Sequence, residues 1–256
     1  MNSEEFSMRS NSTQSNNDIF YAENISKYFK KSPGKTLDKL RNFPKFIPRQ
    51  DLAKFLAKNE IFQKLINVHG DIVECGVFFG SGLFSWAQFS AIYEPYNHNR
   101  HVIGFDSFSG FPNITDEDKS SCNNEQLNIG GLNANVAFED LIEGINLYDI
   151  NRPLGHLPKV ELVKGDATKT IPEYISMNKH LVVSLLYLDF DLFEPTRIAL
   201  EYFFPRMPKG AVIVFDELNQ KQWPGETLAL LETIGINKLR IQRFSYVPQL
   251  SYCVIE

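Results

Sequence analysis

Acidic side chains directly follow the most apolar segments of this 256-residue chain. Asp189 follows the run LVVSLLYL, and Asp216 and Glu217 follow the run AVIVF. Nearly continuous apolar runs are typical of parallel strands buried on both faces, and neighbouring strands lie about 5 Å apart. We therefore expect the three carboxylates to converge at the carboxyl edge of a sheet.

Three converging carboxylates repel one another unless a cation lies between them. A site made only of oxygen ligands favours Mg²⁺, Ca²⁺ or Mn²⁺ over zinc. The alternative is that these acids cap helices or are solvated. A further acid, Asp191, is expected to point away from Asp189 and to cap the next helix.

A glycine-rich segment, GDIVECGVFFGSGLFSW at 70–86, has the composition of a strand, a tight turn and a helix. Such a turn presents backbone N–H groups to a nucleotide-like ligand at a helix N-terminus. Its glycine spacing is G-x-x-x-G-x-G, whereas dinucleotide-binding turns have G-x-G-x-x-G. The turn therefore predicts a nucleotide-like ligand but disfavours NAD.

Two further acids end predicted strands, Asp106 after HVIGF and Asp166 after VELVKG. In an open α/β sheet, Asp106 is placed to accept hydrogen bonds from a ribose diol, and Asp166 to accept one from an adenine amino group. Both positions are also ordinary ones for turn or helix-capping carboxylates, and Asp166 would cap a helix at 167–177. The residues alone leave these alternatives open.

The elements that position these acids alternate between strand and helix. Strands are predicted near 71–74, 101–106, 160–166, 181–189, 210–216, 238–244 and 251–255. Five β/α alternations followed by a strand pair predict a doubly wound, Rossmann-like α/β sheet, whose ligands bind at the carboxyl ends of the strands. The polar segment 107–131 is long enough to be a lid over that edge.

The chain before the sheet has a different composition. Residues 1–18 are rich in Ser and Asn and are expected to be flexible. Helices predicted at 19–31 and 48–68 form an extension at 19–68, which would cap the sheet or form a subunit interface. The catalytic domain is predicted at 69–256, and the helical extension makes a homo-oligomer the expected assembly.

Composition excludes several classes of protein. A hydrophobic content of 43% and a charged content of 22% are typical of a soluble globular protein. A net charge of −5 with no long basic run argues against nucleic-acid or membrane partners. Three widely spaced cysteines argue against a disulfide framework or a zinc site. No signal peptide or membrane span is apparent in the sequence. A cytoplasmic location is therefore expected.

Four motifs in order, VECGVFFGSG, VIGFDSFSGFP, LLYLDFDLFEPT and FDELNQKQWPGE, resemble the macrocin O-methyltransferase (TylF/MycF-type) family over roughly 45–256. The chain most resembles the branch of calicheamicin-pathway sugar O-methyltransferases. The resemblance implies a class I S-adenosylmethionine-dependent methyltransferase fold with its last strand antiparallel. It also implies a divalent cation, usually Mg²⁺, and a deoxysugar hydroxyl as acceptor, nucleotide-linked or attached to a natural product.

The resemblance also assigns roles to residues. The cofactor would be held by residues of three motifs: Glu74, Gly76, Gly80 and Ser81 at the methionine part, Asp106 and Ser107 at the ribose, and Asp166 and Ala167 at the adenine. The reaction would be run by residues of the later motifs: Asp189, Asp216 and Glu217 on the metal, Asp189 also as general base, and Trp223 and Glu226 on the sugar.

Three positions depart from related enzymes. Phe190 replaces a common glycine, and Glu217 replaces a second aspartate. Leu192 stands where catechol-type enzymes carry a lysine, which disfavours a catechol substrate. The competing hypotheses are a metal-independent small-molecule methyltransferase, an NAD-dependent enzyme and a non-catalytic binding protein.

Overall fold

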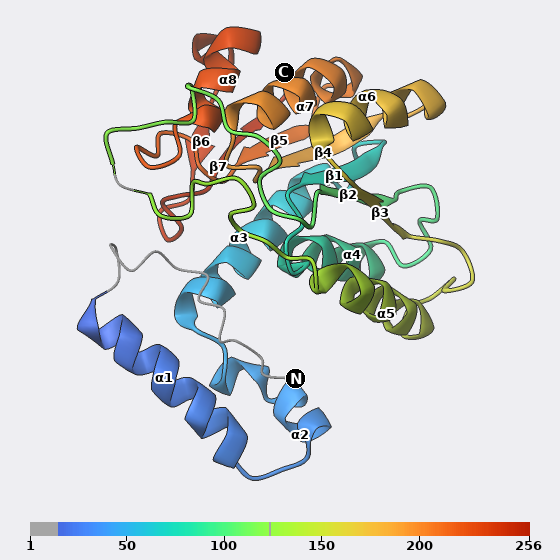
Figure 1. Ribbon diagram of the computed structural model, residues 1–256. Helices are drawn as coiled ribbons and strands as arrows, with labels where there is room; N and C mark the ends of the chain where they lie inside the picture. The colour runs from blue at the N-terminus through green and yellow to red at the C-terminus, as the bar shows by residue number, and fades with distance from the viewer. Residues whose placement is uncertain (1–14, 123) are drawn as a thin grey trace.

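The computed structural model describes residues 15–122 and 124–256 (Figure 1). Within these residues the strands form one seven-stranded sheet with the order β3-β2-β1-β4-β5-β7-β6. The strands are β1 Asp71–Cys75, β2 Val102–Asp106, β3 Val160–Lys164, β4 Val183–Leu188, β5 Val212–Phe215, β6 Gln242–Arg243 and β7 Ser251–Val254. Strands β1 to β5 pair in parallel, whereas β7 runs antiparallel to both β5 and β6. The predicted doubly wound sheet with an antiparallel last strand is confirmed.

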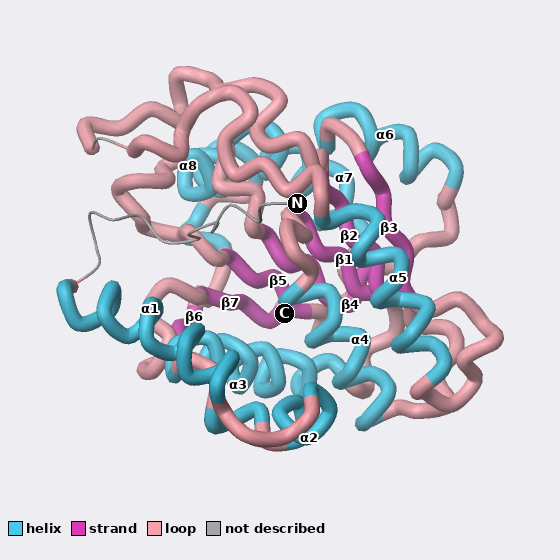
Figure 2. The backbone as a smooth tube through the Cα atoms, turned by 60° about the horizontal axis from the view of Figure 1, so that its bottom comes forward, coloured by secondary structure: helices cyan, strands magenta, loops and turns pink. Residues whose placement is uncertain are grey.

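Helices cover both faces of the sheet (Figure 2). One face packs against α3 Arg49–Leu65, α4 Ser81–Tyr93 and α5 Ala137–Ile150, and the other against α6 Ala167–Met177, α7 Phe193–Phe203 and α8 Gly225–Thr233. Each face has its own apolar cluster, because alternate side chains of the buried strands point to opposite sides. The three-layer arrangement leaves the carboxyl ends of the strands free of helices.

Strand register brings the ends of three neighbouring strands level. Cys75 of β1 pairs with Leu188 of β4, and Leu188 pairs with Phe215 of β5. Every residue of β4 and β5 is buried, as their apolar sequences predict. Because the ladders are aligned, the residues that follow these strand ends leave the sheet side by side.

The N-terminal extension consists of two different parts. In the described part of the chain, α1 Asn16–Lys31 and α2 Thr36–Arg41 bury no residue, and the short helix η2 Phe43–Lys45 follows them. By contrast, α3 buries Ala57, Lys58, Ile61, Phe62 and Leu65 and is part of the layer that covers the sheet. α3 belongs to the predicted extension at 19–68 but packs on the sheet of the predicted catalytic domain at 69–256. The division between these two parts stays a prediction.

The prediction of a flexible segment at 1–18 falls mainly on residues outside the described range, although residues 16–18 form the first turn of α1. Two short 3₁₀ helices, η3 Phe204–Arg206 and η4 Ile236–Lys238, complete the elements. In residues 15–122 and 124–256, no helix is both long and apolar enough to cross a membrane.

Candidate active site

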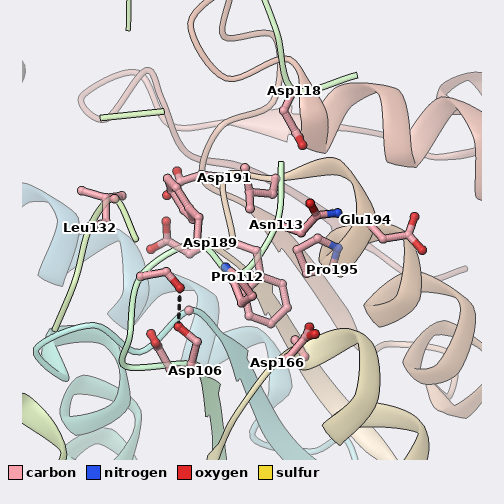
Figure 3. Close-up of a pocket in the computed structure, with 18 of the residues that line it drawn as sticks. Asp106, Pro112, Asn113, Asp118, Leu132, Asp166, Asp189, Asp191, Glu194 and Pro195 are labelled. Carbon is pink, nitrogen blue, oxygen red and sulfur yellow. Dashed lines mark hydrogen bonds between the residues drawn. The ribbon is translucent and has the colours of Figure 1, made fainter. Parts of the chain in front are cut away.

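A cavity of about 780 Å³ opens at the carboxyl ends of the strands. It lies beside β1 and β4, where the strand order reverses, which is the position where open α/β sheets bind ligands. Figure 3 shows Asp106, Asp166, Asp189 and Asp191 around it. Its volume is in the range of small-molecule sites, so it can hold a ligand of drug-like or nucleotide-like size.

The cavity collects most of the site residues predicted from sequence. Its walls include Gly76, Asp106, Ser107, Asp166, Ala167, Asp189, Asp216, Glu217 and Trp223. Four predicted residues are not on its wall, namely Glu74, Gly80, Ser81 and Glu226. The contacts of those four residues with a ligand stay predictions.

The carboxylate of Asp106 shapes the glycine turn. Its Oδ2 accepts hydrogen bonds of 2.8 Å from the backbone N–H groups of Val77 and Phe78. Its Oδ1 accepts a third from the N–H of Phe108 at 2.6 Å. Two donors of the turn are thus directed at Asp106 rather than at a ligand. Oδ2 thus accepts two donors, whereas Oδ1 accepts one and keeps capacity for a further donor such as a ribose hydroxyl.

The glycines of the turn serve different purposes. At Gly76 φ is +96°, and a Cβ there would lie 2.0 Å from the carbonyl oxygen of Asp189. Gly82 instead makes room for Glu74, because a Cβ at 82 would lie 1.7 Å from Glu74 Oε1. Only the first of these close approaches borders the cavity.

Glu74 lies beneath the turn, with 2% of its surface exposed. Burial raises the pKa of Glu74 to about 8, although the ammonium of Lys58 acts in the opposite direction. Its Oε2 has no hydrogen-bond partner within the described part of the chain. Glu74 is therefore a buried group below the glycine turn, and its contact with the methionine part stays a prediction.

Asp166 performs the capping role that the sequence left open. Its Oδ1 accepts hydrogen bonds from the N–H of Thr168 at 3.1 Å and from its Oγ1 at 2.7 Å. Burial pushes the pKa of Asp166 upward, but the bonds from Thr168 and Lys169 outweigh it and leave the pKa below its usual value. Because Asp166 also lines the cavity, capping α6 and facing a ligand are compatible.

The predicted convergence of Asp189, Asp216 and Glu217 is present, since all three line the cavity beyond β4 and β5. Burial, then the charge of Asp216, raises the pKa of Asp189 to about 7. Burial, then the charges of Asp216 and Asp191, raises the pKa of Glu217 to about 10. A carboxylate whose pKa lies near neutrality is suited to general-base catalysis, and Asp189 has that property.

Two other acids lie beyond β4 and β5, Asp191 and Glu226. Asp191 does not turn away, because β4 ends at Leu188 and Asp191 adopts a left-handed φ of +63°. It lines the cavity with Asp189 (Figure 3). Glu226 is fully buried, and its Oε1 accepts the N–H of Glu217 at 3.0 Å. Glu226 therefore contacts the backbone of Glu217, and its contact with the sugar stays a prediction.

A cationic residue was missed by the sequence interpretation. Lys54 of α3 lines the cavity, and its Nζ lies 3.0 Å from Oδ2 and 3.3 Å from Oδ1 of Asp216. Lys58, one helical turn later, lies over the ring of Tyr187 at 4.9 Å. The available signal was spacing: Lys54, Lys58, Ile61 and Leu65 share one helix face, and two lysines on the buried face require acidic or aromatic partners.

The carboxylates as arranged do not fit a divalent cation. Asp216 is engaged on both oxygens, since Oδ1 also accepts the hydroxyl of Tyr187 at 2.9 Å. Among the residues that the structure describes, no group of three His, Cys, Asp or Glu side chains is placed to hold a metal ion. A cation bound to Asp216 would compete with the ammonium of Lys54 for the same carboxylate.

The loop between β2 and α5 covers the cavity and is fastened to the second half of the sheet. Asp118, which is buried, accepts the N–H of Phe193 at 2.6 Å through Oδ1 and the N–H of Thr115 at 2.8 Å through Oδ2. The ring of Phe111 packs edge-on against Trp223 with centroids 5.9 Å apart. These contacts support the predicted role of the loop as a lid.

Replacement of Asp118 should loosen the lid. In Asp118→Ala the N–H of Phe193 loses its acceptor, and a hydrogen bond to a carboxylate contributes about 1.5–3 kcal/mol. We expect faster proteolysis within 107–131 and a higher KM for the acceptor. The matched control is Asp116→Ala, because Asp116 is exposed and pairs with Lys119. Equal cleavage of both variants would show that Asp118 does not hold the lid.

Comparisons with known proteins agree with this geometry. Residues 46–228 match the family described as macrocin O-methyltransferase (TylF). The structure of CalS11, a calicheamicin methyltransferase, is 28% identical, with a TM-score of 0.90 over 98% of this chain and 99% of that one. An apo structure of CalS11, described as a TDP-rhamnose 3'-O-methyltransferase, is 29% identical, with a TM-score of 0.81 over 94% and 95% of the chains.

The O-methyltransferase NovP, at 18% identity, shares the fold with a TM-score of 0.57 over 79% of each chain. No curated protein sequence matches the chain. The family match spans well over half of the sequence and includes the glycine turn and the acids of the cavity. The chain belongs to the macrocin O-methyltransferase family and is an S-adenosylmethionine-dependent O-methyltransferase with a class I fold.

Proposed function

We propose that this enzyme methylates a hydroxyl group of a deoxysugar, with a nucleotide-linked sugar as the preferred acceptor. The observation that carries the proposal is the similarity to CalS11 over nearly the whole of both chains. The two structures of that protein are described as a calicheamicin methyltransferase and as a TDP-rhamnose 3'-O-methyltransferase. A lidded cavity of about 780 Å³ leaves room for an acceptor beside the methyl donor.

The methyl donor would be bound between the glycine turn and the ends of β2 and β3. Gly76 lets the backbone approach closely, Oδ1 of Asp106 has capacity for a ribose hydroxyl, and Asp166 also lines the cavity. S-adenosylmethionine supplies an electrophilic methyl group when bound there. Holding donor and acceptor in a near-attack geometry can lower the barrier by about 7–11 kcal/mol.

Asp189 is the proposed general base. It leaves the sheet next to Gly76, since its N–H donates to the carbonyl of Cys75 at 2.8 Å. That position is between the cofactor turn and the acids that follow β5. A carboxylate there can accept the proton of the sugar hydroxyl as the hydroxyl oxygen attacks the methyl group, while the lid excludes water.

The divalent cation stays a prediction from the family resemblance. The resemblance implies Asp189, Asp216 and Glu217 as its ligands, and such a cation would lower the pKa of the acceptor hydroxyl. As arranged, however, Asp216 is engaged by Lys54 and Tyr187, so these carboxylates do not fit a divalent cation.

The proposed function is tested by incubating the enzyme with S-adenosylmethionine and TDP-rhamnose. We expect S-adenosylhomocysteine and a singly methylated sugar nucleotide, detected by chromatography and mass spectrometry. Thermal shifts should be produced by S-adenosylhomocysteine and not by NADH, which separates a methyltransferase from an NAD-dependent enzyme. Cofactor binding without methylation of any nucleotide-linked deoxysugar would overturn the choice of acceptor.

We also propose that the chain forms a homo-oligomer through its first two helices. Within the described residues, α1 and α2 bury nothing, although Phe20, Leu37 and Leu40 are 67%, 57% and 59% exposed. A second copy would remove this apolar surface from water. Light scattering should therefore give a mass that is a multiple of 29.4 kDa, and Leu37→Ser/Leu40→Ser should lower it. A monomeric wild-type protein would contradict the proposal.

A further inference from the structure

The three acids expected to bind a metal already have a positive charge among them. Lys54 Nζ forms an ion pair with Asp216 at 3.0 Å and lines the same cavity as Asp189 and Glu217. Burial disfavours the charged form of Lys54, but Asp216, Asp189 and Glu217 together raise its pKa above the usual value. The ammonium therefore interacts with the same carboxylates that a divalent cation would require.

The position of Lys54 is built into the fold. α3 packs on the sheet through Ile61 and Leu65, which are fully buried. One turn before them, Lys58 is 6% exposed and lies over the ring of Tyr187. The hydroxyl of Tyr187 in turn donates to Oδ1 of Asp216. Asp216 is thus held by two donors from different elements, and Lys54 is directed at the open side of the cavity.

We propose that the ammonium of Lys54 takes the place of the divalent cation in this enzyme and stabilises the acceptor oxygen during methyl transfer. The inference rests on the proposed function, because it assigns a residue to that reaction. As the O–H bond of the acceptor breaks, its proton moves to the carboxylate of Asp189. The oxygen forms a bond to the methyl carbon, and the C–S bond breaks with its electron pair remaining on sulfur. The products are a methyl ether, S-adenosylhomocysteine and protonated Asp189.

A positive charge beside the acceptor oxygen matters most while that oxygen carries partial negative charge. Lys54 has 37% of its side chain exposed, so its head group can contact both Asp216 and a bound hydroxyl. Ammonium groups are compact cations with three donors, which allows such sharing. Lys54 would therefore affect turnover far more than binding of the methyl donor.

The test combines metal binding with kinetics. Mn²⁺ is titrated into wild-type enzyme, Lys54→Met, Lys54→Arg and the control Lys64→Met, and free Mn²⁺ is followed by electron paramagnetic resonance. Lys64 lies on the same helix but over the ring of Tyr252, and it does not line the cavity. Methyl transfer by each protein is then measured with EDTA and with Mg²⁺, and S-adenosylhomocysteine affinity by calorimetry.

We expect wild-type enzyme to leave the Mn²⁺ signal unchanged and to keep its rate in EDTA. Lys54→Met should lower kcat about 100-fold, the usual effect of removing one group that stabilises transition-state charge. Its affinity for S-adenosylhomocysteine should stay within about twofold because the donor half of the site is intact. Lys54→Arg should recover part of the rate, and Lys64→Met should match wild type.

Stoichiometric Mn²⁺ binding by wild-type enzyme, together with loss of activity in EDTA, would overturn the inference. It would mean that Lys54 withdraws to admit a metal. The Mn²⁺ titration needs neither acceptor nor turnover, so it remains decisive if no deoxysugar is methylated. Absence of all methyl transfer would count against the proposed function, whereas Mn²⁺ binding by wild type would count against the role of Lys54.

Discussion

Asp189→Asn should lower kcat by about 10²–10⁴-fold, the range that a positioned general base contributes. The amide has nearly the shape of the carboxylate but cannot accept the proton of the sugar hydroxyl. Donor affinity should be unchanged, because the N–H of residue 189 still binds the carbonyl of Cys75. Single-turnover methyl transfer and calorimetry with S-adenosylhomocysteine measure the two quantities.

The pH profile provides a second readout of the same residue. Burial raises the pKa of Asp189 to about 7, and a base must be deprotonated to act. We expect kcat/KM to fall about tenfold per pH unit below that value and to reach a plateau above it. The control is Asp140→Asn, an exposed change on α5. If Asp189→Asn keeps the wild-type rate and profile, the proton goes elsewhere.

Gly76→Ala should destabilise the protein by about 2–5 kcal/mol, combining the cost of a left-handed backbone with overpacking. At this position φ is +96°, and the added Cβ would lie 2.0 Å from the carbonyl oxygen of Asp189. Strands β1 and β4 would have to move apart at the cavity. Urea denaturation should show the loss, and S-adenosylhomocysteine should no longer raise the melting temperature of any folded fraction.

The variant Gly130→Ala separates the cost of a left-handed backbone from the cost of overpacking. Gly130 has a φ of +79°, but among the described residues no heavy atom beyond Gly130 and its chain neighbours lies within 4 Å of a Cβ built on it. We expect Gly130→Ala to lower the free energy of unfolding by about 1–2 kcal/mol, the cost of a left-handed backbone alone. A Gly76→Ala variant no less stable than Gly130→Ala would show that the sheet can relax around the added methyl group.

The sheet and the main acids could be predicted from the sequence because their signals are local. The apolar runs before Asp189 and Asp216 specify buried parallel strands, and strand ends share one edge whatever the details of packing. The helix at 167–177 was predicted with its observed bounds, since Asp166 caps it and Asn178 follows its last residue. Residues placed by the backbone of a regular element were therefore predicted well.

The sequence could not predict the surroundings of side chains that are placed by tertiary contacts. Asp191 was expected to turn away from Asp189, but the chain leaves β4 before it, takes a left-handed turn and brings both acids to the cavity. Glu226 is drawn beneath Glu217 by a backbone N–H that no motif reveals. Lys54 comes from a helix that precedes the sheet by sequence, and its pairing with Asp216 depends on how α3 docks.

Lys54 and Asp216 are 162 positions apart in the sequence, so activity should appear late during folding. A chain synthesised from its N-terminus makes α3 before any strand and β5 after four others. Contacts so distant in sequence close large loops and tend to form late. The ion pair is therefore completed only when both halves of the sheet have assembled, so a partly folded chain should be inactive even where its cofactor turn is already native.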